Sequence, residues 1–135
     1  MNDLLTDLVN YLKTVDPSTF DLRKWLIIEG DKIVSGCPLS YACLIPSWKA
    51  KGMTLSHVGV AFEPNFQNET GGFAVALFLN KPYQWVRDVF YPDLYKEKKG
   101  KEALDAVITR IQKEIDHGRC GSVGSGGVVE DGTQA

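Results

Sequence analysis

Cysteine and histidine are the residue types with the greatest chemical potential in this 135-residue chain, and they are few. Cys37 precedes Pro38, where we expect a short helix to begin, and a thiol at a helix N-terminus can have a lowered pKa and act as a nucleophile. His57 is one of two histidines and could serve as its base. A cysteine-dependent enzyme or a small-ligand binder that uses Cys37 is therefore one hypothesis. The competing interpretation is that Cys37 and Cys43 are small core residues, since free cysteine is among the most buried residue types.

The spacing of these residues favours neither a disulfide nor a metal site. In a helix, the distance from Cys37 to Cys43 is about 9 Å of rise, whereas bridged cysteines need Cα atoms closer than about 7 Å. Structural zinc sites need about four ligands, usually in closely spaced pairs, and Cys37, Cys43 and His57 do not have that spacing. Ser56 and His57 would point to opposite faces of a strand, so they do not form a hydrolase pair. We expect no metal.

Cofactor and acid–base motifs are also missing from the sequence. The glycine-rich run at residues 121–127 lacks the Gly-Lys-Ser/Thr ending of a phosphate-binding loop. Carboxylates such as Asp88 and Asp93 are scattered and do not suggest a general acid and base. We therefore expect no cofactor.

Lysines and aromatic residues gather in front of the last predicted helix. Lys98 and Lys99 belong to the one basic cluster, and Tyr91 and Tyr95 flank it. Lysines beside aromatic rings can bind phosphates and stack bases, which makes a nucleic-acid accessory one hypothesis. Acidic residues interrupt the run, however, and the net charge of −2 argues against a dedicated nucleic-acid binder. Tyrosine and tryptophan also anchor protein interfaces, so the predicted binding residues are Tyr91, Tyr95, Lys98, Lys99 and Trp48.

Two amphipathic helices are predicted to frame the fold. Apolar residues recur at three- and four-residue spacing over residues 3–15 and again from Glu102 to His117, with Gly118 as the stop. Between them we expect a hairpin around Gly30, a short helix over residues 38–44, a strand over residues 57–62 and a loop over residues 65–72. Two further helices are expected, over residues 73–79, ended by Asn80, and from Pro82 to before Pro92. The fold class is α+β, with two long terminal helices and shorter helices packed on a small, mostly antiparallel sheet.

The length suits a single domain. Residues 1–118 are predicted to form one globular α+β domain, and residues 119–135 a flexible Gly/Ser-rich tail that cannot bury enough side chain to offset its ordering entropy. The longest apolar run, residues 73–79, is far shorter than the ~20 residues of a membrane helix. The N-terminus does not resemble a secretory signal, and three cysteines do not form a disulfide framework. We expect a cytoplasmic protein without membrane contact.

The order of several short motifs resembles a family of small proteins found in bacteria and their phages. Residues 20–25 are Phe-Asp-Leu-Arg-Lys-Trp, residues 36–43 hold two cysteines, and residues 89–92 are Val-Phe-Tyr-Pro. Family members carry a Phe-Asp-x-x-x-Trp stretch, a Cys-Gly-Thr-x-x-Cys knot and a Phe-x-Pro-x-x-Tyr element. Here proline follows Cys37 where the family has glycine. The resemblance covers roughly residues 3–117 and implies a fold and a bacterial or phage origin, but no activity.

The sequence as a whole predicts a non-enzymatic protein that binds another macromolecule, with a host or phage protein as the partner. The resemblance implies a phage-encoded or prophage accessory, for example an anti-defence factor. The Cys37 enzyme or small-ligand binder and the nucleic-acid accessory are the alternatives, and the oligomeric state is left open.

Overall fold

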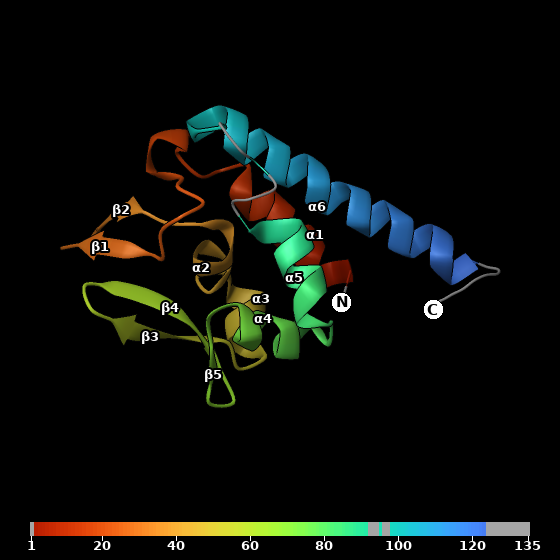
Figure 1. The fold of residues 1–135 in the computed structure, drawn as a ribbon, viewed down its shortest axis with the longest axis horizontal. Coiled ribbons are helices and arrows are strands. Elements are labelled where there is room, and N and C mark those ends of the chain that lie inside the picture. Colours follow the sequence, from red (N-terminus) through yellow and green to blue (C-terminus); the bar gives the residue numbers. More distant parts are fainter. Residues whose placement is uncertain (1, 92–94, 96–97, 124–135) are drawn as a thin grey trace.

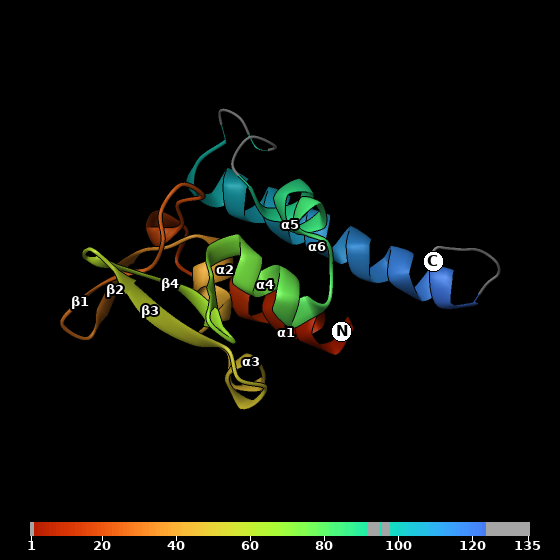
Figure 2. The same ribbon diagram turned by 60° about the horizontal axis from the view of Figure 1, so that its bottom comes forward.

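The computed structural model describes residues 2–91, 95 and 98–123. Within these residues the chain forms six α-helices, one 3₁₀ turn, and two antiparallel sheets of two and three strands (Figure 1). The sheets lie at one end of the helical body (Figures 1 and 2). The predicted α+β class is confirmed, but there are two small sheets where one was expected.

The first helix, α1 (Asn2–Leu12), places Leu5, Leu8 and Leu12 in the core, as its apolar spacing predicted. It ends earlier than expected, because the Thr14 hydroxyl and amide both donate to the Tyr11 carbonyl and turn the chain. With 11 residues α1 is of ordinary length, so the prediction of two long terminal helices is not confirmed at this end.

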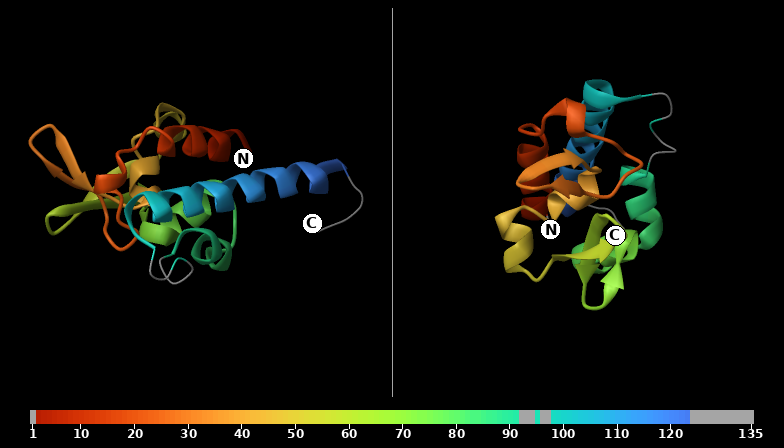
Figure 3. Two further views of the ribbon diagram at one scale, coloured as in Figure 1. Left: turned by 90° about the horizontal axis from the view of Figure 1, so that it is seen from above. Right: turned by 90° about the vertical axis from the view of Figure 1, so that its left-hand side faces the viewer.

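The last helix, α6 (Gly100–Val123), has 24 residues and buries Val107, Ile111 and Ile115. It packs along α1 and extends past it (Figure 3). The helix continues through Gly118, where we expected it to end, because an isolated glycine only lowers helix stability and does not terminate a helix by itself. Of the predicted tail, residues 124–135 lie outside the described residues.

The predicted hairpin around Gly30 is confirmed. Strand β1 (Ile27–Glu29) pairs with β2 (Lys32–Ser35), and Gly30 has the positive φ of 64° that a tight turn requires. A helical turn, η1 (Pro17–Thr19), precedes this hairpin and is capped by the Asp16 carboxylate, which accepts from the Ser18 amide.

The predicted strand over residues 57–62 is wrong, because the chain reverses in the middle of it. Strand β3 (Thr54–Val58) turns at Gly59, with φ of 62°, into strand β4 (Ala61–Phe66). A second tight turn then leads to strand β5 (Glu69–Thr70), inside the segment expected to be a loop. The valines on both sides of Gly59 predict a strand, although the conformational freedom of glycine also suits a two-residue turn.

Four further helices complete the fold. They are α2 (Pro38–Ala42), α3 (Pro46–Ala50), α4 (Gly71–Leu79) and α5 (Tyr83–Phe90). The prediction of helix for residues 73–79 is confirmed, and Asn80 ends α4 in the left-handed conformation with φ of 56°. Pro82 caps α5 as expected. No helix among the described residues combines the length and apolarity needed to cross a membrane.

Candidate functional site

The site is organised by the segment Phe20 to Trp25, which connects η1 to β1. The Asp21 amide donates to the Gly36 carbonyl over 2.9 Å, and the Gly36 amide donates to the Thr19 carbonyl over 2.9 Å. The Asp21 carboxylate accepts from the Arg23 amide over 2.9 Å and so tightens a turn. This turn holds Leu22 half-buried and Arg23 exposed, between two pockets.

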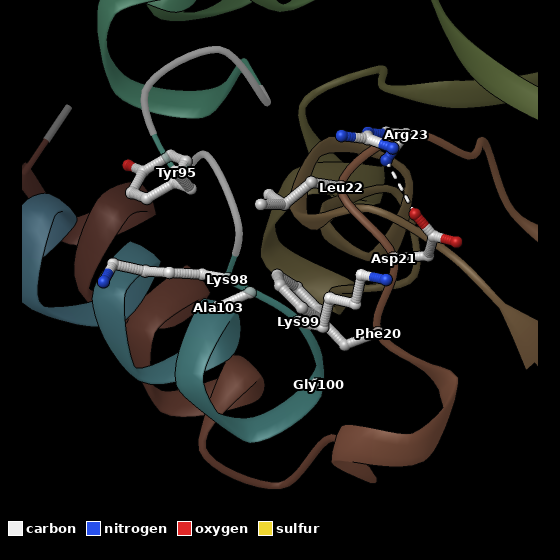
Figure 4. A pocket seen from close by; sticks show the side chains of 9 residues that line it. All are labelled: Phe20, Asp21, Leu22, Arg23, Tyr95, Lys98, Lys99, Gly100 and Ala103. Atoms are coloured by element: carbon white, nitrogen blue, oxygen red, sulfur yellow. Dashed lines mark hydrogen bonds between the residues drawn. The ribbon is translucent and has the colours of Figure 1, made fainter.

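The first pocket, the cationic pocket, lies between this segment and the start of α6 and has a volume of about 280 Å³. Its lining combines cationic and apolar side chains, shown in Figure 4: Phe20, Asp21, Leu22, Arg23, Tyr95, Lys98, Lys99, Gly100 and Ala103. The structure therefore brings together three of the predicted binding residues, Tyr95, Lys98 and Lys99. Lys99 reaches toward Asp21, whereas Lys98 points away from Leu22, and its ammonium lies 3.8 Å from the Glu102 carboxylate.

Tyr95 forms the inner wall of the cationic pocket. It is buried, and its hydroxyl donates to the Val89 carbonyl near the end of α5. Burial raises the pKa of the phenol to about 12, so the group stays neutral at physiological pH. Tyr95 therefore ties α5 to the pocket wall, and its hydroxyl is already bonded within the protein.

The second pocket, the apolar pocket, lies on the other side of Leu22 and Arg23 and has a volume of about 320 Å³. Its walls are mostly apolar and aromatic: Leu22, Arg23, Lys24, Trp25, Cys37, Leu39, Phe90 and Tyr91. Two cationic side chains belong to this lining, and a third lies over one of its rings. Arg23 and Lys24 are exposed at its edge, and the Arg87 guanidinium lies over the Tyr91 ring, 5.8 Å from the ring centre.

Tyr91 is held in position by a close contact with α4 and α5. Its hydroxyl forms a hydrogen bond of 2.7 Å with the hydroxyl of Tyr83. A Cβ atom on Gly72 would lie 2.5 Å from the Tyr91 hydroxyl oxygen, so only glycine fits at that point of α4. Burial is the main reason why the pKa of Tyr91 is raised. The ring is thus a neutral, fixed wall of the apolar pocket.

Cys37 does line a pocket, but it lacks the features of an activated nucleophile. The residue is 7% exposed, and its thiol lies 3.6 Å from the Ser40 hydroxyl, itself buried. Burial raises the pKa of the thiol, and this effect outweighs the hydrogen bonds at the start of α2. This direction is opposite to the lowered pKa that the Cys37 hypothesis requires, and the burial of Cys37 agrees with its interpretation as a core residue.

His57 is not a partner of Cys37. It lies exposed on β3, where its ring packs on Phe62 with ring centres 4.4 Å apart. No hydrogen bond between an imidazole and a thiol occurs among the described residues. Nor do three or more histidine, cysteine or carboxylate side chains of the described part of the chain cluster in a way that could hold a metal ion.

The prediction of Trp48 as a binding residue is wrong. Its side chain is 0% exposed, its indole N–H donates to the Leu4 carbonyl over 3.0 Å, and its ring stacks on Phe78. Tryptophan buries its large apolar ring when its one polar atom finds a partner, and α1 supplies that partner. Trp48 is a core residue that joins α3 to α1.

The cationic and aromatic side chains of Arg23, Lys24 and Trp25 were not among the predicted binding residues. Basic residues next to a tryptophan are nevertheless a recognisable signal of a binding segment. Their importance comes from the fold, which places this segment against Tyr91 and Lys99 from distant parts of the sequence.

Comparison with known proteins finds no match for this chain: no protein-family model, no curated protein and no solved structure.

Proposed function

We propose that this protein binds another protein through the two pockets beside residues 20–25, and that the bound segment is acidic and carries an apolar anchor residue. The observation that supports this proposal is an apolar, aromatic pocket whose lining includes the exposed cationic side chains of Arg23 and Lys24. Trp25 and Tyr91 supply the kind of aromatic wall that dominates protein interfaces. Arg23 and Lys24 would attract carboxylates that flank the anchor.

The arrangement of the pockets favours an extended partner. Leu22 and Arg23 line both pockets, so a bound chain could place an anchor against Tyr91 and continue past Arg23 toward Lys99. Asp21 is the only acidic residue in either lining, considering the described residues alone. Charge complementarity therefore selects an acidic segment over a basic one.

A small-ligand binder is the second candidate, because the apolar pocket has a volume typical of ligand sites and Cys37 forms part of its wall. The same cationic rim would then select an apolar anion. A cysteine-dependent enzyme is disfavoured, since the Cys37 thiol is buried and held neutral. The resemblance to bacterial and phage proteins supports, by analogy only, a host or phage protein as partner and a role as a phage accessory or anti-defence factor.

Selection of binding peptides from a displayed random library, with the full chain as the target, tests the proposal. We expect the enriched peptides to combine one aromatic or aliphatic residue with neighbouring Asp or Glu, and to lose binding to Leu22→Asp and to Arg23→Glu. Lys32→Glu is the matched control, because Lys32 is an exposed lysine on β2 that lines neither pocket. Peptides without acidic enrichment, or peptides that bind Arg23→Glu as well as wild type, would contradict the proposal.

A further inference from the structure

Strand β3 forms one edge of the three-stranded sheet. The strand order is β3-β4-β5, and β3 pairs with β4 alone. Figure 1 shows β3 along the outer side of its hairpin, with β4 between it and the β1–β2 hairpin. Within the described part of the chain, no other strand pairs with this edge.

The hydrogen bonds of β4 determine which β3 residues point outward. The Phe62 amide donates to the Leu26 carbonyl over 2.8 Å, and the Leu26 amide donates to the Phe62 carbonyl over 3.1 Å. In an antiparallel strand, one residue directs both backbone groups to the same side, and the next residue directs them to the other. The backbone amide and carbonyl of Phe62 therefore point away from β3. His57, which lies opposite Phe62 on β3, forms no backbone hydrogen bond with it.

The same alternation applies along the whole ladder. Ser56 and Glu63 form a hydrogen-bonded pair, and Leu55 and Pro64 form the next, non-hydrogen-bonded pair. Proline fits at position 64 because this pair requires no amide hydrogen directed toward β3. The amide and carbonyl groups of Leu55 and His57 consequently point off the edge of the sheet. They are available to another strand.

This edge lacks the features that normally prevent strands from pairing. Native edge strands are protected by lysine, proline or a bulge, but β3 is Thr-Leu-Ser-His-Val in regular register with β4. Its end is also apolar and exposed: Val58 is 42% exposed and Val60, in the following turn, is 82% exposed. A regular, uncharged edge beside exposed valines is suited to strand addition.

We propose that the β3 edge binds the β3 edge of a second copy of this chain, antiparallel and with Ser56 on the two-fold axis. In this register Leu55 lies opposite His57 of the partner subunit, and each pair exchanges both of its backbone hydrogen bonds. About four such bonds form across the axis. The three-stranded sheets of the two copies would then become one continuous sheet.

Symmetry and charge favour a second copy as the occupant. The outward residues, Leu55 and His57, lie at equal distances on either side of Ser56, so the edge is complementary to itself in a two-fold arrangement. Ser56 is small and uncharged, which allows the two copies of it to face each other in a close, non-hydrogen-bonded pair. This inference is independent of the proposed function, because the β3 edge contains no residue of either pocket.

Sedimentation equilibrium of the full chain, from micromolar to near-millimolar concentration, tests the proposal. We expect wild type to approach twice the monomer mass and Ser56→Lys to remain a monomer, because two ammonium groups would face each other at the axis. Within one chain the new lysine would lie opposite Glu63, so the variant should fold, and its melting temperature verifies this. A monomeric wild type, or a dimer unaffected by Ser56→Lys, would overturn the proposal.

Cysteine cross-linking tests the register itself. In a Cys120→Ser background, Ser56→Cys should form a disulfide-linked dimer on mild oxidation, since facing residues on neighbouring antiparallel strands have suitably close Cα atoms. Thr54→Cys is the matched control, because the register places Thr54 opposite Val58 of the partner subunit and not opposite itself. Equal cross-linking of the two variants would reject this register. A mixture of Thr54→Cys and Val58→Cys should cross-link only between the two different chains.

Discussion

The hydroxyl groups of Tyr83 and Tyr91 lie 2.7 Å apart, and this bond connects helix α5 to the wall of the apolar pocket. Tyr83 in turn stacks on Phe73 of α4, with ring centres 4.1 Å apart. The position of the pocket wall therefore depends on the packing of α4 against α5, although neither Tyr83 nor Phe73 lines the pocket.

We predict that Gly72→Ala displaces Tyr91 and weakens binding at the apolar pocket. The new Cβ atom would lie 2.5 Å from the Tyr91 hydroxyl oxygen, so the ring must move. Overpacking of this kind costs about 1–3 kcal/mol, more than alanine gains over glycine within a helix. Urea denaturation and peptide titration measure the two effects. Tyr83→Phe is the comparison, since it removes the hydrogen bond to the Tyr91 hydroxyl but leaves the ring packing in place, so it should displace Tyr91 less than Gly72→Ala does. Unchanged binding to Gly72→Ala would show that Tyr91 is not part of the site.

Trp48→Ala is predicted to destabilise the protein by about 3–5 kcal/mol, because it removes a fully buried ring and its hydrogen bond to the Leu4 carbonyl. Chemical denaturation measures this loss in the free energy of unfolding. Phe73→Ala serves as the comparison, since Phe73 is more than half exposed and should cost far less. Equal losses for both variants would mean that Trp48 does not belong to the core.

The thiol of Cys37 is predicted to react slowly with iodoacetamide in the folded protein. Burial raises its pKa, so the reactive thiolate is scarcer than in an unfolded chain, where the pKa is about 8.5. Mass spectrometry of the alkylated peptide, as a function of pH, measures the rate for Cys37 in native and in urea-denatured protein. Faster alkylation of Cys37 in the native than in the urea-denatured protein at neutral pH would contradict this prediction and support the enzyme hypothesis.

Stability is predicted to decrease in alkaline solution because of Cys43. Burial raises the pKa of this thiol to about 12, so the folded state holds its proton more tightly than the unfolded state does. Its contribution to stability is fully present below the unfolded pKa of about 8.5 and is lost as the pH rises toward 12. Urea denaturation at neutral and alkaline pH should show a smaller decrease for Cys43→Ala than for wild type. An identical decrease in both proteins would contradict this assignment.

The helices could be predicted from the sequence because their signals are local. Leucine spacing identified α1, and Asn80 and Pro82 marked the boundary between α4 and α5. The turn at Gly59 was not predicted because the valines on both sides of it favour a continuous strand. Only the pairing of β3 with β4 shows that the chain reverses there. Long-range pairing of this kind leaves little trace in a single strand.

The candidate site was predicted only in part for a similar reason. The cluster of Lys98, Lys99 and Tyr95 is visible as a run in the sequence, and the structure places these residues in one pocket. That Arg23 lines the same pocket, and Trp25 the neighbouring one, depends on the bonds of Asp21 and Gly36, which join segments distant in sequence. Trp48 was wrongly predicted to be a binding residue because the sequence does not reveal that its indole N–H donates a hydrogen bond to the buried Leu4 carbonyl.

The most direct test of the proposed binding site compares three proteins: wild type, Arg23→Glu and Lys32→Glu. Fluorescence anisotropy measures the affinity of each for a selected acidic peptide, at low and at moderate salt. We predict that Arg23→Glu weakens binding by about tenfold or more, corresponding to about 1.4 kcal/mol or more, and that the difference shrinks as salt screens the charges. Lys32→Glu should bind like wild type. Equal affinities for Arg23→Glu and Lys32→Glu would contradict the proposal that this cationic, aromatic site binds an acidic protein segment.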